Sequence, residues 1–145
     1  MITITEIEDA IIEELKSEIS YLKTCGSIGE FEVDEIEELL VQCPAAYVMY
    51  DGGDFEEGAG EALDRDMTFS VIVVAKNVRG GDEARHGKGS EKGAYDMIED
   101  VRAALTGNSC GLDITGLLPD REEAIAGDKE IAVYGIKFRT RCEES

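Results

Sequence analysis

The chain contains a single histidine, His86, and no tryptophan. Catalytic triads and dyads need a base beside the nucleophile, and this base is most often a histidine. His86 lies in a glycine-rich segment, where a solvated side chain is the simpler interpretation. The sequence therefore predicts a protein that is not an enzyme and that uses no cofactor.

Basic residues are also scarce, because 14 Lys and Arg stand against 33 Asp and Glu, which gives a formal net charge of -19. Such a charge repels phosphate backbones and anionic lipid head groups. Direct, sequence-specific binding of nucleic acid and binding to membranes are therefore not expected. The imbalance is uneven, since residues 1–66 hold 19 of the acids and only 3 of the bases.

Long apolar runs are missing, and the first residues have no basic region followed by an apolar one. Neither a membrane span nor a secretory signal is expected, which favours the cytoplasm. The four cysteines are scattered without a C-x-x-C pair, a pattern typical of free thiols in a reducing compartment. They are Cys25, Cys43, Cys110 and Cys142.

Apolar residues at helical spacing predict three helices. A capping box at Thr5–Glu8 begins a long first helix that continues to Gly26. The acids of residues 34–37 begin a shorter second helix, which Pro44 ends. Apolar positions between Ala94 and Leu105 define a third helix, with one face towards a sheet.

Three further segments are typical of strands. Residues 45–50 form a short apolar run, and residues 67–77 are apolar on both faces, which predicts a central strand. Residues 131–141 alternate, which predicts a half-exposed strand, whereas residues 108–128 are interpreted as an irregular connection. We expect a single α+β domain over residues 1–145, with a central, mostly antiparallel sheet flanked by about three helices.

Two glycine-rich segments, near residues 51–66 and 78–92, are predicted to be mobile loops. Six of the acids in the first would suit calcium or magnesium, but their spacing does not match the calcium-binding loop pattern. A solvated acidic loop is therefore the preferred interpretation, and a metal site is the alternative. The acids are Asp51, Asp54, Glu56, Glu57, Asp64 and Asp66.

Three basic residues, Lys137, Arg139 and Arg141, share one face of the last predicted strand. One interpretation makes them a solvated face or partners in ion pairs within the chain. The other is that they dock against the acidic helices of an identical neighbour. Such head-to-tail contacts close into a ring when the rotation permits. Arg79 and Arg85, in the second glycine-rich segment, are assigned to the same candidate subunit interface.

The order of the segments resembles a family of small tail proteins from Mu-like phages and prophages. The resemblance covers most of the chain and rests on this order, together with the stretches NVRG at residues 77–80 and GAY at residues 93–95. The other matching stretches are ITEIEDAIIEEL (4–15), YLKT (21–24), PAAYVMYDGG (44–53), FSVIVVAKNVRG (69–80), GAYDMIEDVRAALTG (93–107), GLDITGLLP (111–119) and residues 132–140.

The resemblance implies a tail terminator or tail-completion protein, which has no catalytic residues to carry over. Such a protein assembles as a hexameric ring and contacts the tail tube and the head–tail connector. It is found in the bacterial cytoplasm during assembly and then in the virion tail. The charge leaves a second function open, an acidic mimic of DNA that inhibits a DNA-binding partner.

Overall fold

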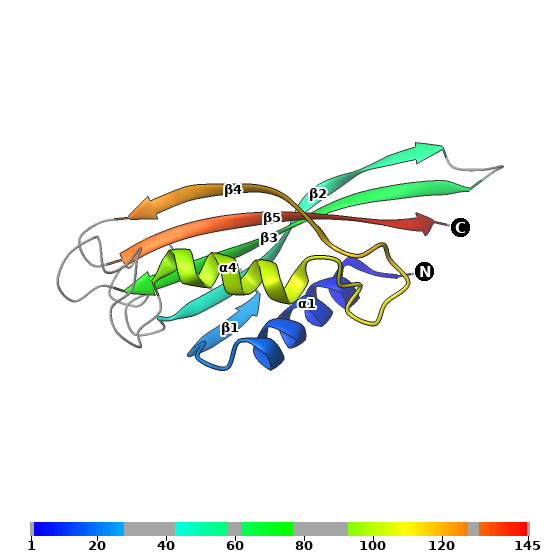
Figure 1. Ribbon diagram of the computed structural model, residues 1–145. Coiled ribbons are helices and arrows are strands. Elements are labelled where there is room, and N and C mark those ends of the chain that lie inside the picture. The colour runs from blue at the N-terminus through cyan, green and yellow to red at the C-terminus, as the bar shows by residue number, and fades with distance from the viewer. Residues whose placement is uncertain (1, 28–42, 58–61, 77–92, 128–130, 145) are drawn as a thin grey trace.

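The computed structural model describes residues 2–27, 43–57, 62–76, 93–127 and 131–144, which form two helices and five strands (Figure 1). The expected α+β class is confirmed. The second predicted helix, from residue 34, and the loop at 78–92 lie outside the described residues. The elements are α1 (Ile4–Glu18), β1 (Thr24–Ser27), β2 (Ala45–Glu57), β3 (Leu63–Lys76), α4 (Ala94–Leu105), β4 (Leu118–Gly127) and β5 (Ile131–Glu144).

The five strands form one sheet in the order β1-β2-β3-β5-β4. β1 runs parallel to β2, and the other neighbouring pairs are antiparallel, so the expected, mostly antiparallel sheet is confirmed. β3 is the central strand, as its apolar residues on both faces predicted. Phe69 and Val71 are buried on one face, and Ile72 and Val74 are buried on the other.

Both described helices pack on the same face of the sheet, where they form the larger hydrophobic core (Figure 1). Leucine, isoleucine, valine and methionine recur at intervals of three and four residues in each helix, which places them in one stripe. Burial of each such side chain stabilises the fold by about 1.5–3 kcal/mol. The fully buried members include Ile7, Ile11, Leu15, Met97, Val101 and Leu105 from the helices and Phe69, Val71, Ile136 and Phe138 from the sheet. Neither described helix is long and apolar enough to cross a membrane.

The first helix begins one capping box earlier than predicted. The Thr3 side chain accepts a hydrogen bond from the Glu6 backbone N–H, and the Glu6 carboxylate accepts one from the Thr3 N–H, both at 3.1 Å. Thr3 and Thr5 begin the same kind of pattern, so the sequence alone does not separate them. The helix ends at Glu18, not at Gly26, because the chain turns to form β1 beside β2.

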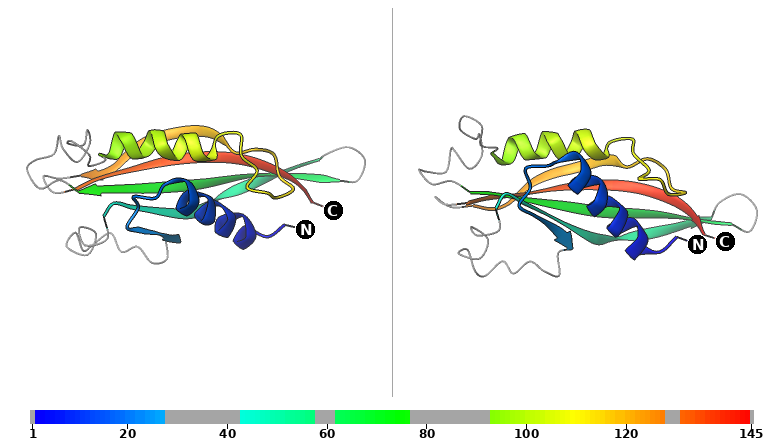
Figure 2. Two further views of the ribbon diagram at one scale, coloured as in Figure 1. Left: turned by 60° about the horizontal axis from the view of Figure 1, so that its bottom comes forward. Right: turned by 90° about the horizontal axis from the view of Figure 1, so that it is seen from below.

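The predicted mobile loop at residues 51–66 is wrong, because its described residues form the outer halves of β2 and β3. Their hairpin extends past both helices (Figures 1 and 2). A bulge between Tyr50 and Gly52 separates this hairpin arm from the inner part of β2. Most residues of the arm are exposed, which is consistent with their polar side chains. Antiparallel pairing of β3 with β5 stabilises the arm as a sheet although its composition is typical of a loop.

The irregular connection predicted for residues 108–128 is wrong for its second half, which is β4. Every residue of β4 except Glu123 is exposed, and bulges at Asp120 and Ile125 interrupt its pairing with β5. Bulges shift the side chains that follow them relative to the two faces. The strand therefore lacks the apolar alternation by which strands are recognised.

Candidate subunit interface

The side of β4 and β5 that faces away from the helices carries two of the predicted interface residues, Lys137 and Arg139. Directly opposite residues on neighbouring strands project from the same side. Leu118 lies opposite Arg139, and Arg121 lies opposite Lys137. We call this surface the β4–β5 outer face, and it consists of Leu118, Asp120, Arg121, Glu123, Ile125, Lys137 and Arg139.

Carboxylates of the same chain lie beside both of these cations. Lys137 Nζ is 3.9 Å from Asp51 Oδ2 and 3.9 Å from Glu123 Oε1, and Arg139 Nε is 3.3 Å from Asp120 Oδ1. Asp51 also accepts a hydrogen bond from the buried Ser70 hydroxyl. Ion pairs as exposed as that of Arg139 contribute at most about 1 kcal/mol each, because water screens them.

Arg141, the third cation of the row, lies further along β5 and holds the hairpin arm. Its Nε is 2.8 Å from Asp66 Oδ1, and its Nη2 is 3.0 Å from Asp66 Oδ2 and 2.6 Å from Glu56 Oε2. Asp64 Oδ2 lies 3.7 Å from Nη1. The hydrogen bonds from Arg141 lower the pKa of the Asp66 carboxyl below its usual range. Arg141 therefore joins β5 to both strands of the hairpin.

The structure thus brings Lys137, Arg139 and Arg141 onto one side of β5, as the alternation predicted, and pairs each of them within the chain. The acids come from the hairpin arm, from Asp51 and from β4, and not from a helix. Contact of the same cations with a neighbour stays a prediction. Arg79 and Arg85 lie outside the described residues.

Two exposed apolar side chains on the β4–β5 outer face were missed by sequence reasoning. Leu118 is 52% exposed and Ile125 is 46% exposed. The Ile125 side chain lies over Gly135, since a Cβ added at that glycine would approach Ile125 Cδ1 to 3.0 Å. The bulges of β4 conceal this placement in the sequence pattern. The leucine directly before Pro119 was the signal of an apolar edge in the sequence.

The six acids of residues 51–66 named above were also considered as metal ligands. Four of the six, Asp51, Glu56, Asp64 and Asp66, instead lie within ion-pair distance of Lys137 or Arg141. In the part of the chain that the structure describes, no three histidine, cysteine or acidic side chains are grouped so as to hold a metal ion.

A protein-family model described as "Bacteriophage Mu, Gp37" matches residues 3–143. The match includes both described helices and all five strands except Glu144, the last residue of β5. It is in keeping with the resemblance to Mu-like phage proteins that the order of the segments indicated. Comparison with curated proteins found no match.

Proposed function

The chain belongs to the bacteriophage Mu Gp37 family, and on this basis we propose that it is a non-enzymatic structural subunit of a phage or prophage tail. Its role is that of a tail terminator or tail-completion protein, which assembles into a hexameric ring. The ring joins the tail tube to the head-proximal connector. The subunit is made in the bacterial cytoplasm and ends in the virion tail.

The observation that carries the assembly part of this proposal is the composition of the β4–β5 outer face. It places Leu118 and Ile125, both exposed, on the same side of the sheet as Arg139, with Leu118 directly opposite Arg139. Apolar side chains together with arginine are typical of surfaces that become buried in protein–protein contacts. This face is the first surface of the proposed contact.

The second surface is the exposed acidic side of α1, on the next subunit. Asp9, Glu13 and Glu18 are exposed there, and α1 packs on the other side of the sheet from the β4–β5 outer face. Two different surfaces on opposite sides of one subunit are what a head-to-tail contact requires, and such contacts close into rings. The charges of Arg139 and of these acids are complementary.

The proposed contact is tested by measuring the mass of the assembly in solution for matched variants. Leu118→Asp places a charge in the contact and should reduce the ring to smaller species. Leu63→Asp makes the same change at another exposed leucine, on the hairpin arm, and should leave the ring intact. Equal dissociation by both variants would argue against the assigned face.

A charge exchange tests the pairing of the two surfaces. Arg139→Glu should weaken assembly, and Glu13→Lys should weaken it from the other side. Because a head-to-tail contact joins the two surfaces of different copies, combining both changes in one chain should restore assembly. A double variant that assembles no better than either single variant contradicts this pairing.

A monomer that captures DNA-binding proteins instead of tail proteins would favour the alternative function, an acidic mimic of DNA.

A further inference from the structure

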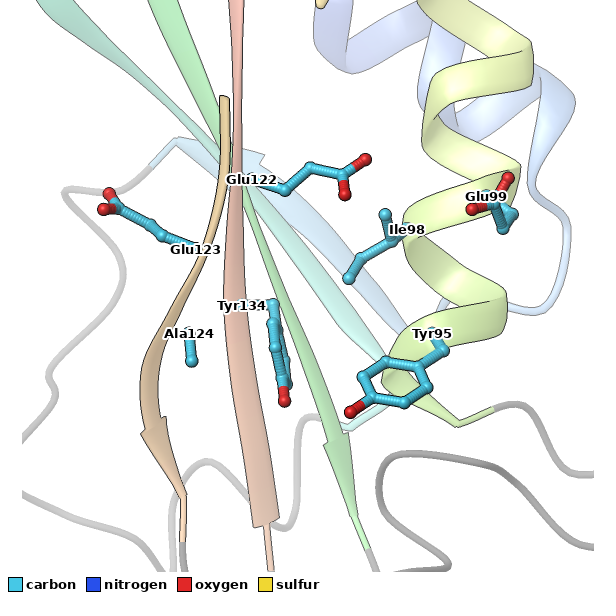
Figure 3. A pocket seen from close by; sticks show the side chains of 7 residues that line it. All are labelled: Tyr95, Ile98, Glu99, Glu122, Glu123, Ala124 and Tyr134. Carbon is cyan, nitrogen blue, oxygen red and sulfur yellow. The ribbon is translucent and has the colours of Figure 1, made fainter. Parts of the chain in front are cut away.

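A pocket of about 440 Å³ opens between α4 and the two outer strands, β4 and β5 (Figure 3). It exists because α4 packs against β3 and β5, so that β4 lies beyond the helix. Its volume falls in the range of pockets that hold small ligands or side chains. The lining residues are Tyr95, Ile98, Glu99, Glu122, Glu123, Ala124 and Tyr134.

Two tyrosine rings line one end of the pocket. The ring centroids of Tyr95 and Tyr134 are 5.6 Å apart, and the ring planes are at 78° to each other. Tyr95 is 41% exposed, so part of this aromatic surface is open to a partner. The face of a tyrosine ring attracts a cation within about 6 Å of its centre, and arginine is the most frequent partner.

Two carboxylates lie at the other end of the pocket, that of Glu122 on β4 and that of Glu99 on α4. Glu122 projects from β4 towards α4, whereas Glu123 points to the far side of β4 (Figure 3). Arg102 lies between Glu122 and Glu99, with Nε 3.5 Å from Glu122 Oε1 and Nη1 3.5 Å from Glu99 Oε1. One cation between two carboxylates leaves a net negative charge, and both distances are too long for strong pairing.

We propose that this pocket binds an arginine side chain presented by a basic segment of a partner protein. The guanidinium lies against the rings of Tyr95 and Tyr134, its aliphatic stem contacts Ile98 and Ala124, and the negative charge of Glu122 at the other end of the pocket attracts it. Arginine suits the site better than lysine because a planar guanidinium stacks on aromatic rings, whereas the ammonium of lysine is a strongly hydrated point charge. The net charge of -19 attracts a basic segment to the chain as a whole.

The test is a titration of the full chain with a short blocked peptide, Gly-Gly-Arg-Gly-Gly, followed by NMR. Matched peptides carry lysine or uncharged citrulline in place of arginine. Glu122→Gln should weaken binding of the arginine peptide about twofold to fivefold, because it removes a negative charge that attracts the guanidinium. Tyr95→Leu should weaken it by a similar factor. The order of affinity should be arginine, then lysine, then citrulline.

A variant with the opposite expected sign makes the test specific. Arg102→Gln removes the resident cation, so the arginine peptide should bind about twofold to fivefold more tightly. Glu143→Gln makes the same charge change as Glu122→Gln at an exposed position on β5 outside the pocket, and affinity should not change. Circular dichroism establishes that each variant is folded.

Several results would overturn the proposal. They are equal weakening by Glu122→Gln and Glu143→Gln, equal affinity for the arginine and citrulline peptides, and no binding to the wild type at about 10 mM peptide. A bound apolar peptide with no preference for charge would also overturn it. Binding at the pocket does not depend on the proposed ring. Glu122→Gln should weaken peptide binding and leave the mass of the assembly unchanged. The two proposals therefore fail separately.

Discussion

Arg141 on β5 and Asp66 on β3 form a two-point contact, with Nε 2.8 Å from Oδ1 and Nη2 3.0 Å from Oδ2. The two residues lie directly opposite each other in the register of the strands. The same guanidinium reaches Glu56 on β2, so one side chain connects β5 to both strands of the hairpin arm. A segment rich in acid and glycine is thereby held in a regular sheet.

The first prediction concerns the pH dependence of this contact. The pKa of Asp66 is lower in the folded chain than its ordinary value of 3.8. Its stabilising contribution is therefore complete above about pH 4 and is lost as the pH falls through the folded pKa. Arg141→Gln should lower the melting temperature at neutral pH, and the difference from the wild type should shrink towards about pH 2. Thermal unfolding by circular dichroism measures both.

Arg139→Gln is the matched control for this experiment. Arg139 lies 3.3 Å from Asp120 on the exposed surface and acts on Asp66 only as a weaker charge than Arg141, so its loss should change the melting temperature less. A difference between wild type and Arg141→Gln that stayed constant across the acid range would contradict the role of Asp66.

The second prediction concerns the start of α1. Thr3→Ala removes the acceptor for the Glu6 N–H and should reduce the free energy of unfolding by about 1 kcal/mol. Thr5→Ala should have little effect, because Thr5 lies inside the helix and is exposed. Urea unfolding of the two variants compares them directly. A larger loss for Thr5→Ala would mean that the helix begins at the later capping box.

The third prediction concerns the close approach of β2 and β3 beyond the bulge. A Cβ at Gly53 would lie 2.4 Å from the Asp66 carbonyl oxygen and 2.8 Å from the Tyr50 hydroxyl. Gly53→Ala should therefore reduce the free energy of unfolding by about 1–3 kcal/mol, since a backbone atom must move. Denaturant titration gives this value.

Gly135→Ala is the comparison for this variant. The nearest atoms to its Cβ would be side-chain atoms, with Ile125 Cδ1 at 3.0 Å, and the Ile125 side chain is 46% exposed. The loss should stay below about 1 kcal/mol. A chain that tolerated Gly53→Ala better than Gly135→Ala would show that the hairpin arm is not paired as described.

The fourth prediction concerns the thiols. Burial raises the pKa of Cys25 and of Cys43 to about 11 in each case. Since the thiolate is the reactive form, a disulfide reagent at about pH 8 should modify both residues much more slowly in the folded chain than in the unfolded chain. Mass spectrometry of peptides identifies the modified cysteine. Equal rates in the two states would contradict the burial of these thiols.

Local periodicity was enough to predict some elements of the fold. α4 was predicted at its observed bounds, Ala94–Leu105, because its apolar residues recur at helical spacing. β3 was predicted as central from its apolar residues on both faces, and β5 as a strand from its alternation, although Ile131 and Val133 at the start of β5 are buried and not exposed. In these segments the partner elements reinforce a preference that the sequence already carries.

The remaining elements depend on pairing between distant segments, which composition does not reveal. β1 has only four residues and is stabilised by Ala45–Val48 of β2. The hairpin arm is polar and depends on Arg141, and β4 is exposed and bulged. For the candidate interface, alternation located Lys137 and Arg139, but their carboxylate partners follow from the strand register, and Ile125 was placed only by the bulge.

The most direct test of the proposed tail function is the mass of the wild-type chain in solution, measured by native mass spectrometry and compared with electron microscopy of the same sample. The account predicts one dominant hexameric species with the outline of a ring, which binds to the end of isolated tail tubes. A chain that stays monomeric at about millimolar concentration, and that does not bind tail tubes, would contradict it.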